Sequence, residues 1–109
     1  VEATLNIERA VQIIDIGVSV EIEHTYIGDL SVDLVSPEGQ VISLHQRAGS
    51  GADNLIKIYG MNGESVPELS QLLQTEGQGT WTLRVEDHAS SDLGRILGFG
   101  VEIKGYWAD

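Results

Sequence analysis

Residues 87–94 contain two acidic residues whose spacing could suit a bound metal ion. Its sequence, DHASSDLG, places Asp87 and Asp92 five residues apart in a polar loop that ends in glycine. Calcium takes oxygen ligands at about 2.3–2.6 Å from carboxylates and loop carbonyls, so such a loop can wrap this ion. The spacing differs from that of an EF-hand, and aspartate is also common in turns. The spacing therefore leaves a calcium site and a set of Asx turns open.

Two further aspartates could reach the same end of the molecule. Asp29 precedes an expected strand, and Asp53 belongs to a glycine-rich loop, AGSGADN, at residues 48–54. Strand ends and the loops next to them cluster at the ends of a β-sandwich. We expect Asp29 and Asp53 to share an end with the 87–94 loop, or else to cap strands and turns.

The three histidines offer little catalytic chemistry. The chain has no cysteine, which excludes a thiol nucleophile, a disulfide and a cysteine zinc site. It contains neither a G-x-S-x-G elbow nor an HExxH zinc motif. His24 continues the inward side of a strand, so we expect it to be buried and hydrogen-bonded, and we expect His45 and His88 on the surface. A hydrolase would need His24 or His88 beside a serine and an orienting aspartate.

The aromatic residues raise the possibility of a sugar-stacking platform. Trp81 has the inward parity of its strand, which predicts a core position. Tyr106 and Trp107 close the chain, where they could be exposed or contact a neighbouring domain. The remaining tyrosines are Tyr26 and Tyr59.

Period-two alternation positions these residues. In residues 14–24 it places Ile14, Ile16, Val18, Val20 and Ile22 on one face, the pattern of a strand with one buried side. Similar patterns predict strands at residues 30–35, 41–45, 55–59 and 80–86, and a last inward row of Leu97, Phe99, Val101 and Ile103. The sequence SPEG at residues 36–39 predicts a type I turn. Around Pro67 and Leu69 the pattern allows a helical turn or a packed loop.

Seven or eight short strands with glycine-rich turns predict an all-β, antiparallel two-sheet sandwich. The 109 residues include 13 Gly and 2 Pro, and this length suits a single domain with its own core. We expect residues 1–109 to be one domain of a longer protein.

The charge balance limits the partners. Six Lys and Arg against 17 Asp and Glu give a net charge of −11. Nucleic acids and anionic lipids attract clustered basic residues, so this chain is a poor candidate for either. No apolar run approaches the length of a membrane span.

Two blocks of the sequence resemble one known family. HTYIGDL at residues 24–30, LVSPEG at 34–39 and Leu44 look like the first half of the P domain (P/Homo B domain) of proprotein convertases. GTWTLRVED at residues 79–87, DLG at 92–94 and the row of Phe99, Val101 and Ile103 resemble its second half. The resemblance runs from about Val18 to Ile103 and is closer to the bacterial branch, which is attached to secreted subtilisin-like proteases.

The resemblance implies a jelly-roll β-sandwich that packs on a subtilisin-like catalytic domain of the same chain and stabilises it, with no catalysis of its own. It also implies calcium, with Asp29, Asp87 and Asp92 as ligands and Asp53 as a fourth. Ile27 stands where convertases usually have arginine before Gly-Asp, so a role of that tripeptide is not implied. Phe99 replaces a more usual tryptophan. We expect the isolated domain to be an extracellular monomer.

A different class of function remains open beside this one. A sandwich of this kind could instead be an extracellular binding module for carbohydrate or a protein substrate. An exposed row of aromatic residues would favour the binding module, whereas an exposed apolar patch would favour an accessory domain.

Overall fold

The computed structural model describes residues 1–89 and 94–108, which form seven strands and two short 3-10 helices. The strands are β1 (Glu2–Ile7), β2 (Val11–His24), β3 (Leu30–Val35), β4 (Val41–Gln46), β5 (Leu55–Gly60), β6 (Gly79–Asp87) and β7 (Gly94–Trp107). The helices are η1 (Ile27–Asp29) and η2 (Pro67–Leu72).

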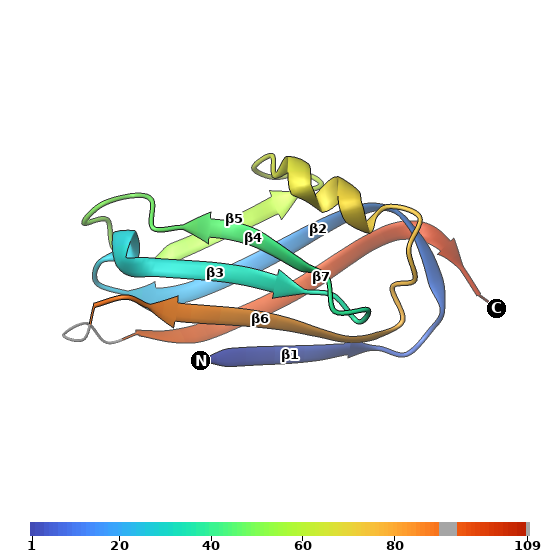
Figure 1. Cartoon of the computed structure of the whole chain (residues 1–109), viewed down its shortest axis with the longest axis horizontal. Helices are drawn as coiled ribbons and strands as arrows, with labels where there is room; N and C mark the ends of the chain where they lie inside the picture. The colour runs from blue at the N-terminus through green and yellow to red at the C-terminus, as the bar shows by residue number, and fades with distance from the viewer. Residues whose placement is uncertain (90–93, 109) are drawn as a thin grey trace.

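The strands form two antiparallel sheets that pack against each other in an elongated sandwich (Figure 1). The four-stranded sheet has the order β1-β6-β3-β4, and the three-stranded sheet has the order β5-β2-β7. All strand pairs within them are antiparallel. The all-β, two-sheet sandwich predicted from the sequence is confirmed. The jelly-roll connectivity stays a prediction.

The core lies between the sheets and is built from the inward row of each strand. Trp81 is fully buried, as its parity predicted, and its indole Nε1 donates to the carbonyl of Gly77 at 3.0 Å. Val18, Leu34 and Leu83 are also fully buried. Each such side chain contributes about 1.5–3 kcal/mol of transfer free energy, so this shared interior holds the two sheets together.

One register shift changes the inward row at the start of β2. The pairing with β7 is irregular between Ile13 and Asp15, where the extra residue of a β-bulge reverses the alternation. Ile13 is fully buried, whereas Ile14 is 40% exposed. The sequence-based prediction that Ile14 faces the core is therefore wrong, while Ile16, Val18, Val20 and Ile22 are buried as expected.

A second register shift affects the last strand in the same way. Ile22 pairs with Ile96, but Glu21 pairs with Gly98, so Leu97 is the extra residue. Leu97 is 49% exposed, and its predicted inward position is wrong. Ile96 takes its place and packs against the core together with Phe99, Val101 and Ile103.

The predicted turns are present. Gly39 has a φ of +88° and donates its N–H to the carbonyl of Ser36 at 2.9 Å, which closes the turn before β4. The stretch around Pro67 forms η2, which buries Leu69 and Leu72. Strand β1, which the sequence analysis did not predict, pairs with β6 and packs Leu5 and Ile7 against the core.

Neither helix among the described residues has the length and apolar character needed to cross a membrane.

Candidate functional site

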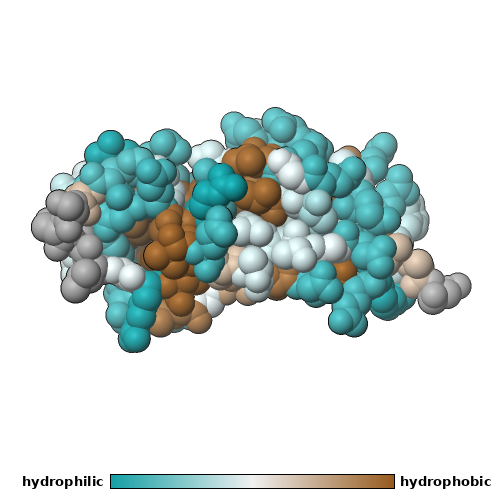
Figure 2. Space-filling model, turned by 60° about the horizontal axis from the view of Figure 1, so that its bottom comes forward, coloured by the Kyte–Doolittle hydropathy of each residue, from teal (hydrophilic) through white to brown (hydrophobic). Residues whose placement is uncertain are grey.

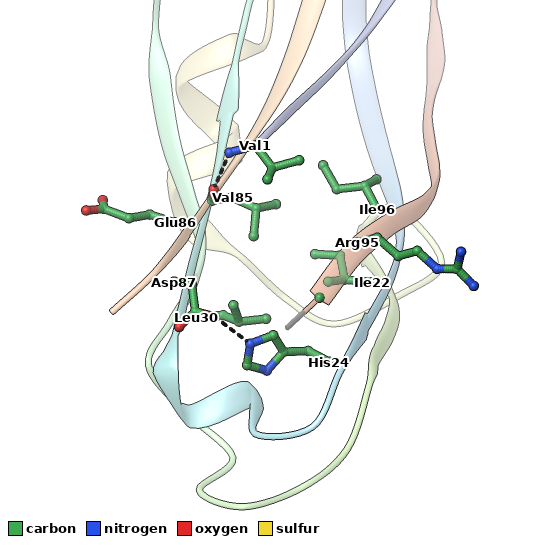
Figure 3. Close-up of a pocket in the computed structure, with 10 residues that line it drawn as sticks. Val1, Ile22, His24, Leu30, Val85, Glu86, Asp87, Arg95 and Ile96 are labelled. Atoms are coloured by element: carbon green, nitrogen blue, oxygen red, sulfur yellow. Dashed lines mark hydrogen bonds and ion pairs between the residues drawn. The ribbon is translucent and has the colours of Figure 1, made fainter. Parts of the chain in front are cut away.

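A cleft of about 310 Å³ opens between the two sheets near the start of β7. Figure 3 shows its walls: Leu30 and Val85 come from the four-stranded sheet, while Ile22 and Ile96 come from the three-stranded sheet. Val1 lies at its edge, and Figure 2 shows hydrophobic surface on the face that carries the N-terminal strand. A concave, mostly apolar site with a few polar groups is the usual form of a binding site.

The polar part of this cleft is the pair formed by His24 and Asp87. His24 ends β2 and is only 2% exposed, and its Nε2 lies 2.8 Å from Oδ2 of Asp87 at the end of β6. The backbone N–H of Tyr26 donates to His24 Nδ1 at 3.0 Å. Because a backbone N–H can only donate, Nδ1 carries no proton, and Nε2 donates to the carboxylate. The predicted burial and hydrogen bonding of His24 are confirmed.

Asp87 accepts hydrogen bonds through both of its oxygens. Besides the bond from His24, its Oδ1 accepts the backbone N–H of Ala89 at 2.9 Å. The hydrogen bond from His24, followed by the one from Ala89, lowers the pKa of the Asp87 carboxyl below its ordinary value, because both donors favour the ionised form. Asp87 is therefore an ionised carboxylate that links the end of β2 to the residues after β6.

The second histidine of this end, His88, contacts a serine. Its Nε2 lies 2.7 Å from Oγ of Ser31, which is only 8% exposed. In a catalytic triad one imidazole contacts the serine through one nitrogen and the aspartate through the other. Here Asp87 bonds His24, while Ser31 bonds His88. Among the described residues, the serine and the aspartate do not share a histidine.

His45 departs from the sequence-based prediction. It was expected on the surface, yet it is 7% exposed, and its Nε2 donates to the carbonyl of Ile27 at 2.9 Å. The reason is a register shift between Val32 and Asp33 in the β3-β4 pair, which leaves Leu44 and His45 both buried. His45 therefore fixes the position of η1. His88 is exposed, as expected.

The backbone brings three of the four predicted calcium ligands to one end of the sandwich. The N–H of His88 donates to the carbonyl of Asp29 at 2.8 Å, which places Asp29 next to the end of β6. The N–H of Asn54 donates to the carbonyl of His24 at 2.8 Å, so the loop with Asp53 joins this end too. Asp92 lies outside the described residues. Within the described ranges, 1–89 and 94–108, no three His, Cys, Asp or Glu side chains form a group that could hold a metal.

The aromatic residues are spread over the molecule. Tyr26 follows the end of β2, whereas Trp107 pairs with Val11 at its beginning, so the 14-residue strand separates them by about 40 Å. Trp107 is stacked under the guanidinium of Arg9, which lies 5.5 Å from its ring centre. Tyr106 is 70% exposed and Tyr59 is fully buried. These residues do not form the row that a sugar platform needs.

The sequence analysis missed the cleft itself, because its walls come from residues far apart in the sequence. Ile22, Leu30 and Val85 each follow the inward parity of their strands, and nothing in that parity distinguishes a cleft wall from a core residue. Ile96 was hidden by the register shift at Leu97. A signal did exist for Asp87, which extends the strand of Trp81 by one residue beyond the predicted end.

Comparisons with known proteins agree with this architecture. The family model described as the proprotein convertase P-domain matches residues 13–103. The chain is 47% identical over 79 residues to leupeptin-inactivating enzyme 1 of Streptomyces exfoliatus, covering 72% of this chain and 16% of that protein. It is 42% identical over 106 residues to a calcium-dependent protease of a Nostoc species, covering 94% of this chain and 16% of that protein.

Among solved structures, the serine protease of Aeromonas sobria contains a similar fold. The match has a TM-score of 0.58 at 19% identity and covers 96% of this chain and 20% of that one. The same protease in complex with a chaperone matches with a TM-score of 0.57, also at 19% identity, over 99% of this chain and 20% of that one. The chain thus spans about one sixth of the length of the curated relatives above. The family match over residues 13–103 shows that this chain belongs to the proprotein convertase P-domain family.

Proposed function

We propose that this chain is a non-catalytic accessory domain that packs on an adjacent subtilisin-like serine protease domain of a secreted protein and stabilises it. The observation that carries this proposal is the family match over residues 13–103. Two relatives in which the matched region is only 16% of the protein are named calcium-dependent proteases. A partner surface that binds only the folded state of the protease domain raises its free energy of unfolding.

The polar groups of the cleft support a structural role for this end of the domain. Asp87 is bound to His24 and to the backbone of Ala89. His24 is held in one tautomer by the N–H of Tyr26. The Ser31–His88 contact has no carboxylate on the same imidazole among the described residues, so the arrangement that would activate a serine nucleophile is not assembled there.

We also infer that calcium stabilises the loops at this end. Two relatives are named calcium-dependent proteases, and the backbone brings the loops of Asp29, Asp53 and Asp87 together. Asp92 follows Asp87 by five residues in the sequence. Carboxylates and loop carbonyls are the donors that calcium prefers. Because the described residues do not by themselves bring three acidic or histidine side chains together, the site requires Asp92 as well. Asp29, Asp87 and Asp92 would hold it, with Asp53 as a further ligand, and the ion would tie separate loops together.

Deletion of this domain from the longer protein tests the accessory role. We expect the remaining protease domain to unfold at a lower temperature and to lose activity faster on heating, because the docking surface no longer contributes to the folded state. Calorimetry of the full and the shortened protein measures this. An unchanged unfolding temperature of the protease domain would contradict the proposal.

Thermal unfolding of the 109-residue chain, with calcium or with a chelator, tests the metal site. At a free calcium concentration of about 100 times Kd, binding adds about 2.7 kcal/mol, which raises Tm by roughly 10–20 °C in a domain of this size. Asp87→Ala and Asp92→Ala should remove the calcium-dependent rise. Glu38→Ala, in the exposed turn before β4, is the matched control and should keep it. An unfolding curve that does not respond to calcium would leave these aspartates as turn formers.

A further inference from the structure

The outer face of the three-stranded sheet has an apolar ridge beside a bare centre. Ile56 and Ile58 of the edge strand β5 point away from the core and are 67% and 48% exposed. Their partners across the sheet on β2 are Glu21 and Ser19, and the next partners on β7 are two glycines. The centre of this face therefore carries almost no side chains, and a groove of about 170 Å³ lies there.

The packing of this chain does not explain the bare centre. A Cβ on Gly98 would meet only the side chain of Glu21, at an ordinary distance of 3.5 Å. On Gly100 it would meet Oγ of Ser19 at 2.6 Å, a hydroxyl that can rotate away. By contrast, a Cβ on Gly17 would lie 2.9 Å from the backbone carbonyl of Met61. Glycine inside a strand often marks the close approach of another backbone.

The charges around this face indicate what could cover it. Glu102 lines the groove, and Glu21 pairs with Gly98 on the same face. Neither carboxylate makes an ion pair with any described residue. The whole chain has a net charge of −11. A second copy would place the same carboxylates against each other, which is unfavourable. A partner with an apolar contact surface and lysine or arginine at its rim complements both the isoleucine ridge and these carboxylates.

The opposite outer face has a different composition. On the four-stranded sheet, the outward positions of β1 and β6 carry polar residues, among them Thr4 and Thr82, which pair with each other. Val41 of the edge strand β4 is its exposed large hydrophobic residue, at 52%. This face resembles an ordinary solvated sheet surface.

We propose that the outer face of the β5-β2-β7 sheet is the surface on which the protease domain of the longer polypeptide docks. This inference rests on the proposed accessory function and adds the place and chemistry of the contact. The match covers only 16% of each of two relatives, so these polypeptides contain a large further part that could cover this face. The Ile56–Ile58 ridge supplies the apolar contact, the glycines allow close backbone approach, and Glu21 and Glu102 pair with basic residues of the protease domain.

Single cysteines in the full-length protein test which face is covered. The chain contributes no cysteine of its own, so the peptide that carries an introduced thiol reports one position. Ile58→Cys and Val41→Cys are a matched pair, because both residues lie on edge strands and are about half exposed. Labelling with a small maleimide should be at least about tenfold slower at Ile58→Cys, since an interface opens only rarely to the reagent.

Charge substitutions in the same protein give the second readout. Ile58→Lys should lower the unfolding temperature of the protease domain, whereas Val41→Lys should not. Gly98→Arg places a long side chain over the bare centre, where a Cβ would meet only the side chain of Glu21 at 3.5 Å. Thr4→Arg is its control on the opposite face. Gly98→Arg should also lower the unfolding temperature of the protease domain. It lies on β7, so its effect remains informative if Ile58→Lys disturbs β5 itself.

The outcomes separate this inference from the function on which it rests. Slow labelling at Ile58→Cys together with a selective effect of Ile58→Lys or Gly98→Arg supports the proposed face. Equal labelling of the two cysteines, with a protease domain that still needs this domain for stability, overturns the face and leaves the accessory function intact. A protease domain indifferent to deletion of this domain overturns both. Protection that disappears on dilution identifies a second copy as the occupant and overturns the proposed partner.

Discussion

His24 and Tyr59 are polar side chains buried in neighbouring strands of one sheet, and their polar atoms have different surroundings. His24 is 2% exposed, and both of its ring nitrogens have partners. Tyr59 is fully buried, and its hydroxyl has no hydrogen-bond partner among the described residues. Burial of an unpaired polar group costs about 1–3 kcal/mol, whereas a paired one stabilises. The two residues are therefore equally buried but affect stability differently. The hydrogen bonds of His24 join separate segments, whereas Tyr59 contributes by filling the core with its ring.

The largest expected loss of stability comes from removing His24, whose ring nitrogens both have hydrogen-bond partners. His24→Ala should lower the free energy of unfolding by about 3 kcal/mol, because it leaves a cavity and removes the partner of the Tyr26 N–H and of Asp87. Urea unfolding with an unchanged m-value measures this loss.

His88→Ala is the matched control for that substitution. The side chain of His88 is exposed, and its hydrogen-bond partner among the described residues is the hydroxyl of Ser31. Its loss should therefore cost about 1 kcal/mol or less. Equal losses in the two variants would show that pairing in the cleft does not distinguish His24.

The buried, unpaired hydroxyl of Tyr59 should lower the folding stability at alkaline pH. Burial, with a smaller contribution from the charge of Glu64, raises the pKa of Tyr59 from 10.0 to about 12. Between these values the unfolded chain releases the phenolic proton while the folded chain keeps it. The stability present below pH 10 is therefore lost as the pH rises towards 12, by on the order of 2–3 kcal/mol.

Tyr59→Phe should remove this alkaline loss. At neutral pH it should leave stability unchanged or raise it by up to about 1 kcal/mol, since the hydroxyl that it deletes has no partner. Tyr106→Phe, at a 70% exposed position, should leave the pH–stability curve as it is. An alkaline loss that persists in Tyr59→Phe would assign it to another group.

The sequence predicted most of the fold because strand alternation is a local property. Trp81, Leu83 and Val85 face the core as their parity requires, and His24 was placed inside by the same rule. The errors at Ile14, His45 and Leu97 fall at register shifts in strand pairing. A bulge depends on the partner strand, so the alternation of one strand cannot reveal it.

The candidate site was less predictable, for a related reason. Parity placed His24 inside but could not identify Asp87 as its partner, because the bond joins residues 63 positions apart. The orphan hydroxyl of Tyr59 was equally out of reach, since a missing partner is a property of the packed interior. The glycines of the three-stranded sheet are visible in the sequence. Whether packing within the chain requires each of them depends on what a Cβ at that position would contact.

The smallest expected effect is on stability in acid. The pKa of Asp87 is lowered, first by the hydrogen bond from His24 and then by that from Ala89. As the pH falls below the ordinary value of 3.8, the unfolded chain binds a proton before the folded chain does. The contribution of Asp87 is thus present above pH 4 and is lost as the pH falls through the lowered pKa.

Asp87→Asn should flatten the acid limb of the pH–stability curve. Glu76→Gln removes an independent part of that limb, because backbone hydrogen bonds from Val11 and Gln78 lower the pKa of Glu76 far from the cleft. The two effects should add in the double variant, since the residues share no partner. If Asp87→Asn leaves the acid limb unchanged while Glu76→Gln flattens it, the carboxylate of Asp87 is not held by His24. The hydrogen bond from the Tyr26 N–H would then be the remaining stabilising partner of the His24 ring.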